Sequence, residues 1–435
     1  MVAAALSGGI AGAVMQQIDD PAVVTEVAVR VDVPTGDLAS IFDRGVMDAA
    51  VVRSAQAVAQ QIGAVATPGR TGSLGLGGVF RNGVRVAGPP SGYLAPVTFF
   101  ALPHPAIGWL LGDEVSAVVG TRSVAMNVET ATLVGAQVGD EIEFELLDGR
   151  FERLVVAAVL DRSVLGGTEV AMTTDTASVL GQPDDTRVVV WNIGDRDDFD
   201  RAIRAAGLDV RIDTKVVRSW DPRDPDATLG SLDTKLKLGQ PWYDLTDDGG
   251  FSVHPSWIAS NLPATRQLIN ASIPVYARCH NQVMGDLRAA FTAIAAAGLA
   301  AYIDVDNANT YGGCYVPRFS RNSGFMSRHT YGMAFDTNTA ANCQGCVPLM
   351  NCDVVRIFRK HGFAWGGNFR EPDGMHFEWV DERRDQIPYA SDYCPNIVTV
   401  EARTAEPGDI TPRVQLGIDV LTIGTLDEHD HPPHD

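Results

Sequence analysis

The sequence predicts an α+β protein built from two domains. Its 435 residues are enough for two or three domains at about 100–200 residues each. Residues 21–220 mix strand-like and helix-like patterns with two hairpin turns. All six cysteines lie between Cys279 and Cys394, in a second globular segment. In chain order we expect an apolar leader or anchor remnant (1–20), an α+β domain of unknown role (21–220), a linker (221–250), a second domain (251–400) and an acidic tail (401–435).

Composition and charge exclude several classes of protein. Hydrophobic residues make up 45% and charged residues 20%, which is typical of a folded globular chain and excludes a fibrous or disordered one. Thirty-four basic and 54 acidic residues give a net charge of −20. A field of that sign repels nucleic acid and anionic lipid, so neither is expected as a partner. The carboxylate excess is explained by solubility.

The amino terminus predicts export from the cytoplasm. Residues 1–15, MVAAALSGGIAGAVM, are small and apolar, but the first basic residue is Arg30, so the basic region of a secretory signal is missing. The segment is therefore interpreted as the end of a longer signal or of a membrane anchor, and an ordinary apolar helix is the alternative. A location outside the cytoplasm, secreted or in a cell envelope, is the expectation.

The cysteines support the same location. An even number confined to one segment indicates disulfides, and hence an oxidising compartment. Six cysteines allow 15 pairings, and the spacing does not choose among them. Two alternatives stay open: six reduced core cysteines, or a thiolate metal site at Cys343, Cys346 and Cys352.

Local patterns predict the elements of the first domain. Alternating valines indicate a strand over 27–33, and helical spacing indicates a helix within 45–62. Asn82-Gly83 predicts a hairpin over 80–86, and Asp148-Gly149 predicts another within 141–159. A strand at 187–191, a helix near 197–206 and a strand at 210–212 then form a βαβ-like piece.

No catalytic constellation is found in this first domain. GSLGLGG (72–78) is rich in glycine, but a Walker loop needs a lysine and the chain has none before Lys215. GVMDAAVVRSAQAVAQQIGA (45–64) and VGDEIEF (138–144) resemble the extracytoplasmic domain of MacB/FtsX-type transporter permeases. That resemblance would fit an anchored amino terminus, and an unassigned binding or spacer domain is the alternative.

The second half begins with a stretch that predicts a linker, since residues 219–241 are rich in Asp, Pro and Gly. A helix follows, with Val283, Leu287, Phe291 and Ile294 on one face and an end near Gly298. We expect a strand over 300–306 and a second helix over 353–361, closed by Gly362 as its left-handed cap.

The segments SRHTYGMAFD (327–336) and WGGNFREPDGMHFEW (365–379) carry candidate metal ligands. A hydrolytic zinc site needs three protein ligands and one open position for water. His329 and Asp336 are separated by seven residues and by a glycine that permits a tight bend, and His376 follows forty residues later. Strand-like alternation would place Asp336 and His376 on polar faces, with apolar residues packed behind them. Glu378, close to His376, would either support the metal ligands without binding the ion or simply be exposed.

Four further residues are candidates for catalysis or substrate binding. Asp373 precedes the second histidine by three residues and is placed to act as general base for a metal-activated water. Arg318 could hold a substrate carboxylate or stabilise an oxyanion. Ser327 either caps the turn or contacts substrate, and Trp365 with the glycines after it would form a wall beside the cleft.

These residues together resemble the zinc D-alanyl-D-alanine peptidase family, which includes VanX, VanY and the L-alanyl-D-glutamate endopeptidases. The family pattern SxHxxGxAxD, followed by an acidic residue three positions before a second histidine, is filled at every fixed position. The resemblance covers about residues 251–395. It implies a VanX/VanY-like domain with a central antiparallel sheet and flanking helices. It also implies Zn²⁺ bound by His329, Asp336 and His376, with Asp373 as catalytic base.

The resemblance further implies that Arg318 orients the substrate, with Arg321 as a rival. Two departures concern substrate choice: the GYRSxxxQ stretch of VanY-type enzymes is missing, and CQGCVPLMNC (343–352) resembles an added, cysteine-stapled loop. The expected function is hydrolysis of peptidoglycan stem peptides, at a D-Ala-D-Ala or an L-Ala-D-Glu bond. The alternative is a non-catalytic module that binds wall peptide, or an envelope scaffold.

Overall fold

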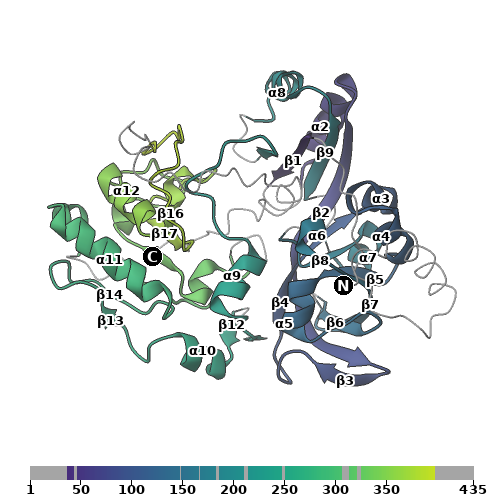
Figure 1. Cartoon of the computed structure of the whole chain (residues 1–435), viewed down its shortest axis with the longest axis horizontal. Helices are drawn as coiled ribbons and strands as arrows, with labels where there is room; N and C mark the ends of the chain where they lie inside the picture. Colours follow the sequence, from purple (N-terminus) through teal and green to yellow (C-terminus); the bar gives the residue numbers. More distant parts are fainter. Residues whose placement is uncertain are drawn as a thin grey trace, which may run out of the picture. The chain divides into compact units, whose positions relative to one another are not determined.

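The computed structural model describes residues 37–43, 47–146, 148–165, 167–182, 186–209, 214–246, 250–305, 313–320 and 325–396. The predicted leader, the acidic tail and the strands expected at 27–33 and 210–212 lie outside these residues. The described residues form two compact units: one reaches Trp220 and includes Trp242–Asp244, and the other contains 221–241 and the described residues from Leu245 to Asn396 (Figure 1). Among the described residues, no helix is both long and apolar enough to cross a membrane.

The first unit is organised around one long strand, β2 (Val65–Arg81). Successive parts of β2 pair with β9 (Arg187–Ile193), β4 (Ala95–Leu102) and β6 (Glu141–Glu145). Because β2 pairs with both β4 and β6, the strands in the order β2-β4-β8-β5-β7-β6 close into a barrel-like sheet. The remaining barrel strands are β5 (Ser123–Asn127), β7 (Phe151–Leu160) and β8 (Val170–Thr173).

The glycine-rich stretch 72–78 lies inside β2. A side chain at Gly75 would come within 2.7 Å of the Tyr243 hydroxyl, and one at Gly72 would come within 2.7 Å of the Phe99 ring. Glycine is therefore required here for close packing of neighbouring side chains against the strand.

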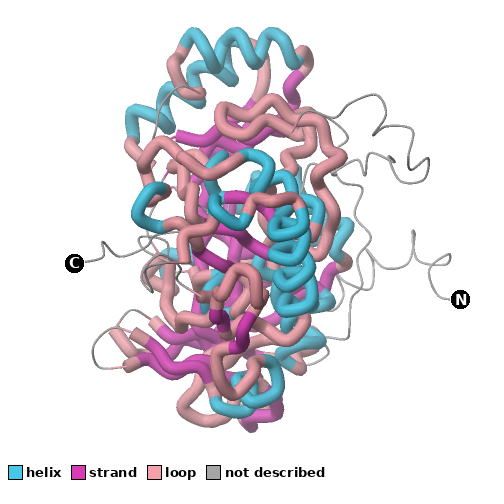
Figure 2. The backbone as a smooth tube through the Cα atoms, turned by 90° about the vertical axis from the view of Figure 1, so that its left-hand side faces the viewer, coloured by secondary structure: helices cyan, strands magenta, loops and turns pink. Residues whose placement is uncertain are grey.

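The same sheet extends beyond the barrel through β9, β1 (Asp37–Asp43) and β10 (Thr214–Arg218). Helix α8 (Arg196–Ala205) connects β9 to β10, with β1 inserted between these two strands and antiparallel to both. The first strand and the helix of the predicted βαβ-like piece are therefore present, and the strand that follows the helix is β10, at 214–218. The predicted helix within 45–62 is α2 (Ala49–Gln61). Figure 2 shows the strands in magenta and the helices in cyan along the backbone.

Both predicted hairpin turns are confirmed. Asn82 and Gly83 have φ angles of 51° and 77° and connect β2 to β3 (Val84–Ala87). Gly149, with φ 77°, lies in the longer turn between β6 and β7. The other helices of this unit are α3 (His104–Leu111), α4 (Asp113–Val118), α5 (Val128–Val134), α6 (Arg162–Leu165) and α7 (Thr174–Val179).

The second unit contains a three-stranded antiparallel sheet, as the resemblance implied. Its order is β15 (Ala334–Asp336), β17 (His376–Trp379) and β16 (Phe363–Trp365). Helices α11 (Val283–Ala296) and α12 (Cys352–Lys360) provide its apolar cover. The Phe358 ring from α12 stacks on Phe377 from β17, and Phe291 from α11 meets Phe335 from β15 edge to face.

Short elements complete this unit. They are β12 (Phe251–Val253), α10 (Pro255–Asn261), β13 (Gln267–Leu268), β14 (Tyr276–Ala277) and the 3-10 helices η1 (Ala300–Tyr302), η2 (Arg328–Tyr331), η3 (Thr339–Ala341) and η4 (Gly366–Asn368). The short strand β11 (Tyr243–Leu245) has its first two residues in the first unit. The strand expected over 300–306 is replaced by η1 at its start. Both long helices end as predicted, with Gly298 and Gly362 at positive φ after them.

The segment predicted as a linker differs most from expectation, because residues 221–241 fold with the second unit. Helix α9 (Ser231–Leu238) lies within it and buries Leu232 and Leu238. The Asp226 carboxylate accepts from Arg359 Nε at 2.8 Å and from Arg359 Nη2 at 2.5 Å. The composition of this segment suggested a loop, but its Asp226 is the buried partner of Arg359, a residue far along the chain.

All six cysteines form disulfides, so neither the reduced alternative nor the thiolate metal site is present. The pairs are Cys279–Cys314, Cys343–Cys346 and Cys352–Cys394. Cys352–Cys394 links residues 42 positions apart and ties the end of the described chain to the start of α12.

Removal of the Cys352–Cys394 disulfide should destabilise the second unit far more than removal of Cys343–Cys346. On chain entropy, a crosslink across 42 residues contributes about 4 kcal/mol, and one across 3 residues contributes about 1.5 kcal/mol. Urea unfolding of the two double-serine variants measures the free energies of unfolding. Equal losses would contradict the expectation.

Candidate metal centre

A short turn positions the first candidate ligand. Helix η2 begins after Ser327, whose hydroxyl accepts from the His329 amide at 3.3 Å, and ends at Gly332 with φ 65°. A side chain at Gly332 would meet the His280 backbone nitrogen at 2.9 Å, so glycine is needed there for space as well as for its φ. The chain then enters β15, which ends at Asp336.

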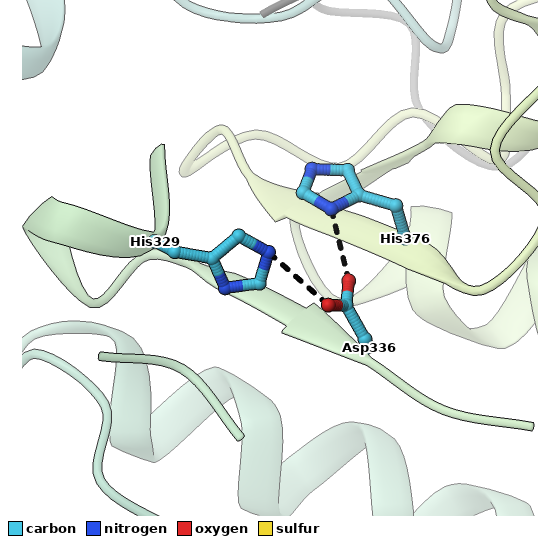
Figure 3. Close-up of side chains that lie close together, drawn as sticks. All are labelled: His329, Asp336 and His376. Carbon is cyan, nitrogen blue, oxygen red and sulfur yellow. Dashed lines mark hydrogen bonds and ion pairs between the residues drawn. The ribbon is translucent and has the colours of Figure 1, made fainter. Parts of the chain in front are cut away.

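The strand register places the other two residues opposite each other. Asp336 on β15 pairs directly with His376 on β17 in the antiparallel ladder. Their side chains meet the His329 ring from η2, so that the three groups converge (Figure 3). Asp336 Oδ2 lies 3.2 Å from His329 Nε2, and Asp336 Oδ1 lies 3.0 Å from His376 Nδ1. One donor atom from each residue lies within 4.8 Å of the others.

The surrounding contacts fix which ring nitrogens face the cluster. His329 Nδ1 lies 3.0 Å from the carbonyl oxygen of Cys314, so this nitrogen donates and Nε2 presents its lone pair toward Asp336. His376 has the opposite orientation, with Nδ1 toward Asp336 and Nε2 3.6 Å from Glu378 Oε2. The donors are therefore two imidazole nitrogens and one carboxylate oxygen. That set suits a divalent transition metal, and His329, Asp336 and His376 could hold such an ion.

The electrostatics of the cluster favour a cation. Burial alone would lower the pKa of His376. Its side-chain interactions with Asp336 and Glu378, together with the negative charges of Asp336 and Asp373, outweigh burial and raise this pKa to about 10. Burial lowers the pKa of His329, although the Asp336 carboxylate acts in the opposite direction. In the metal-free protein the proton on His376 therefore stabilises the fold below pH about 6.5, and this contribution is lost as pH rises towards 10.

Asp373 and Arg318 both act on the cluster electrostatically. The Asp373 charge contributes to the raised pKa of His376, and the Arg318 charge contributes to the lowered pKa of His329. Asp373 is fully buried, and its backbone is fixed by bonds from its amide to Gly366 and from His376 to its carbonyl. Arg318 is half-buried, while its rival Arg321 lies outside the described residues.

Two residues considered for substrate contact, Ser327 and Trp365, are both buried in the second unit. Ser327 is fully buried and serves as the cap of η2, which is the first of its two expected roles. Trp365 is also fully buried, and its indole nitrogen donates to the Gly374 carbonyl at 2.9 Å. Trp365 therefore supports the turn before His376 from inside the core, and does not form a wall exposed to a cleft.

The sequence pattern left the role of Glu378 open and gave no indication of a role for Arg328. Glu378 is fully buried and lies on the same face of β17 as His376, as strand alternation requires. Its Oε1 lies 3.1 Å from Nε of Arg328, which is also buried. The sequence signal for Glu378 was its two-residue spacing from the histidine, whereas nothing in the sequence pairs Arg328 with it.

Comparison with known proteins supports a peptidase. Residues 320–379 match the sequence model of a family described as D-alanyl-D-alanine carboxypeptidase. The matched interval contains His329, Asp336, Asp373, His376 and Glu378, and lies within the second unit. No curated protein matches the chain. The match supports a peptidase-like hydrolase, and the MacB/FtsX-type resemblance of the first unit gains no support.

The raised pKa of His376 generates a prediction for the metal-free protein. At pH 8 its ring should be an imidazolium, because this pH lies below a pKa of about 10. One equivalent of a divalent metal should displace that proton, since a metal ligand must be neutral. Imidazole nitrogen shifts measured by NMR before and after metal addition test this. A neutral His376 ring at pH 8 without metal would contradict the electrostatic account.

Proposed function

We propose that the protein is a zinc-dependent metallopeptidase that hydrolyses peptide bonds in peptidoglycan stem peptides. The observation that carries the proposal is the buried cluster of His329, Asp336 and His376 inside an interval that matches a D-alanyl-D-alanine carboxypeptidase family. Zn²⁺ is the ion we assign, because two imidazoles and one carboxylate form a set typical of catalytic zinc, which needs a further position for water. The disulfides support an extracytoplasmic location, secreted or in the cell envelope.

The proposed mechanism distributes roles among residues of the second unit. A bound zinc ion would supply Lewis acidity, which polarises the scissile carbonyl and acidifies the attacking water. Asp373 accepts the proton of that water and returns it to the leaving amine. Arg318 pairs with a carboxylate of the substrate or with the developing oxyanion. His329 and His376 are kept in their metal-binding tautomers by the Cys314 carbonyl and by Glu378.

Digestion of purified peptidoglycan by the zinc-loaded protein tests the function, with fragment masses as the readout. Release of free D-alanine would indicate carboxypeptidase action, and new amino termini at D-glutamate would indicate endopeptidase action. If the protein binds zinc but releases no fragment, the proposal is wrong. That result would favour a module that binds wall peptide, because such a module does not hydrolyse it.

Asp373→Asn should retain zinc and lose hydrolysis. Loss of a general base costs about 10²–10⁴-fold in rate, and Asp373 is not among the three residues of the metal cluster. Asp381→Asn is the matched control, because Asp381 pairs with Lys237 at the surface and is expected to keep full activity. Rates on wall fragments and zinc content by elemental analysis are the measurements. Undiminished hydrolysis by Asp373→Asn would exclude Asp373 as the base.

A further inference from the structure

A buried ion pair lies directly behind the candidate metal ligands. The side chains of Arg328 and Glu378 are 1% and 0% exposed, and Arg328 Nε is 3.1 Å from Glu378 Oε1. The other carboxylate oxygen, Oε2, lies 3.6 Å from His376 Nε2. Burying two charges costs several kcal/mol of desolvation per ion, so such a pair is weak evidence for stability alone. Its contact with His376 indicates a further role.

Glu378 and Asp336 hold opposite edges of the same imidazole. Nδ1 of His376 lies 3.0 Å from Asp336, and Nε2 faces Glu378. A carboxylate beside Nε2 favours the proton on that nitrogen, which leaves the Nδ1 lone pair directed at the cluster. The distance of 3.6 Å is longer than a hydrogen bond, so Glu378 acts here by charge and orientation.

Arg328 is itself anchored by the segment before the peptidase-like core. Its Nη1 donates to Thr234 Oγ1 at 3.2 Å, and its Nη2 donates to the carbonyl of Leu229. Thr234 lies on α9 and is fully buried. Contacts therefore run from residues 229–234 through Arg328 and Glu378 to His376. The part of the chain that shapes the site extends well before the matched interval, which begins at residue 320.

We propose that Glu378 is a positioning residue for the metal ligand His376, and that Arg328, held by Leu229 and Thr234, keeps the Glu378 carboxylate in place. This inference rests on the proposed function, because it assumes that the cluster binds zinc. Glu378 is predicted to affect metal affinity and coordination geometry, not only the stability of the fold.

The test is zinc affinity of full-length Glu378→Gln, measured by competition with a chromogenic chelator. Loss of the carboxylate that faces the outer nitrogen of His376 should weaken zinc binding about 10–100-fold. The visible spectrum of the cobalt-substituted protein should change as well, because it reports the coordination of His376. Asp226→Asn is the matched control: it disrupts another buried ion pair of the same segment, with Arg359, in which no candidate metal ligand takes part. It should lower the melting temperature and leave zinc affinity unchanged.

The outcomes separate the two proposals. If the wild type binds no zinc, the proposed function fails. If the wild type binds zinc and Glu378→Gln binds it equally well with the same cobalt spectrum, the positioning role is wrong. If Glu378→Gln does not fold, Arg328→Met with Glu378→Gln removes both charges and leaves no unpaired ion. That double variant should show the same loss of affinity, and unchanged affinity in it would overturn the inference.

Discussion

The second unit depends on one carboxylate placed between two imidazoles. Asp336 reaches both His329 and His376 because β15 and β17 pair in the register that sets Asp336 opposite His376. A shift of that register by one residue would turn Asp336 to the other face of the sheet and leave the histidines without their shared partner. The apolar contacts behind the strands, Phe291 with Phe335 and Phe358 with Phe377, hold the register in place.

The rest of the unit secures the groups around this carboxylate. The Cys279–Cys314 disulfide ties down the segment whose Cys314 carbonyl orients His329, and Val316 donates its amide to the His329 carbonyl. Behind His376, the Glu378 and Arg328 charges are buried together. In a site of this kind, where both imidazoles have a supporting partner, the protein itself fixes the orientation of the rings.

Local patterns in the sequence predicted the convergence of the three candidate ligands, and predicted their surroundings poorly. His329, Asp336 and His376 were identifiable because turn and strand alternation act over a few residues. Trp365 was placed at the substrate, although tertiary packing buries it completely. Ser327 was expected either to cap the turn or to contact substrate, and it is the buried cap of η2. Residues 221–241 were predicted to belong to a linker because of their Asp, Pro and Gly content. That composition could not show that Asp226 pairs with Arg359, which is 133 positions away. Barrel closure in the first unit likewise depends on β2 pairing with strands distant in sequence.

Anomalous diffraction at the zinc absorption edge, from crystals of the zinc-loaded protein, tests the central claim most directly. The account predicts one strong anomalous peak within bonding distance of His329 Nε2, His376 Nδ1 and an Asp336 oxygen. The absence of density at this position in crystals that contain zinc, or a peak bound elsewhere in the second unit, would contradict it.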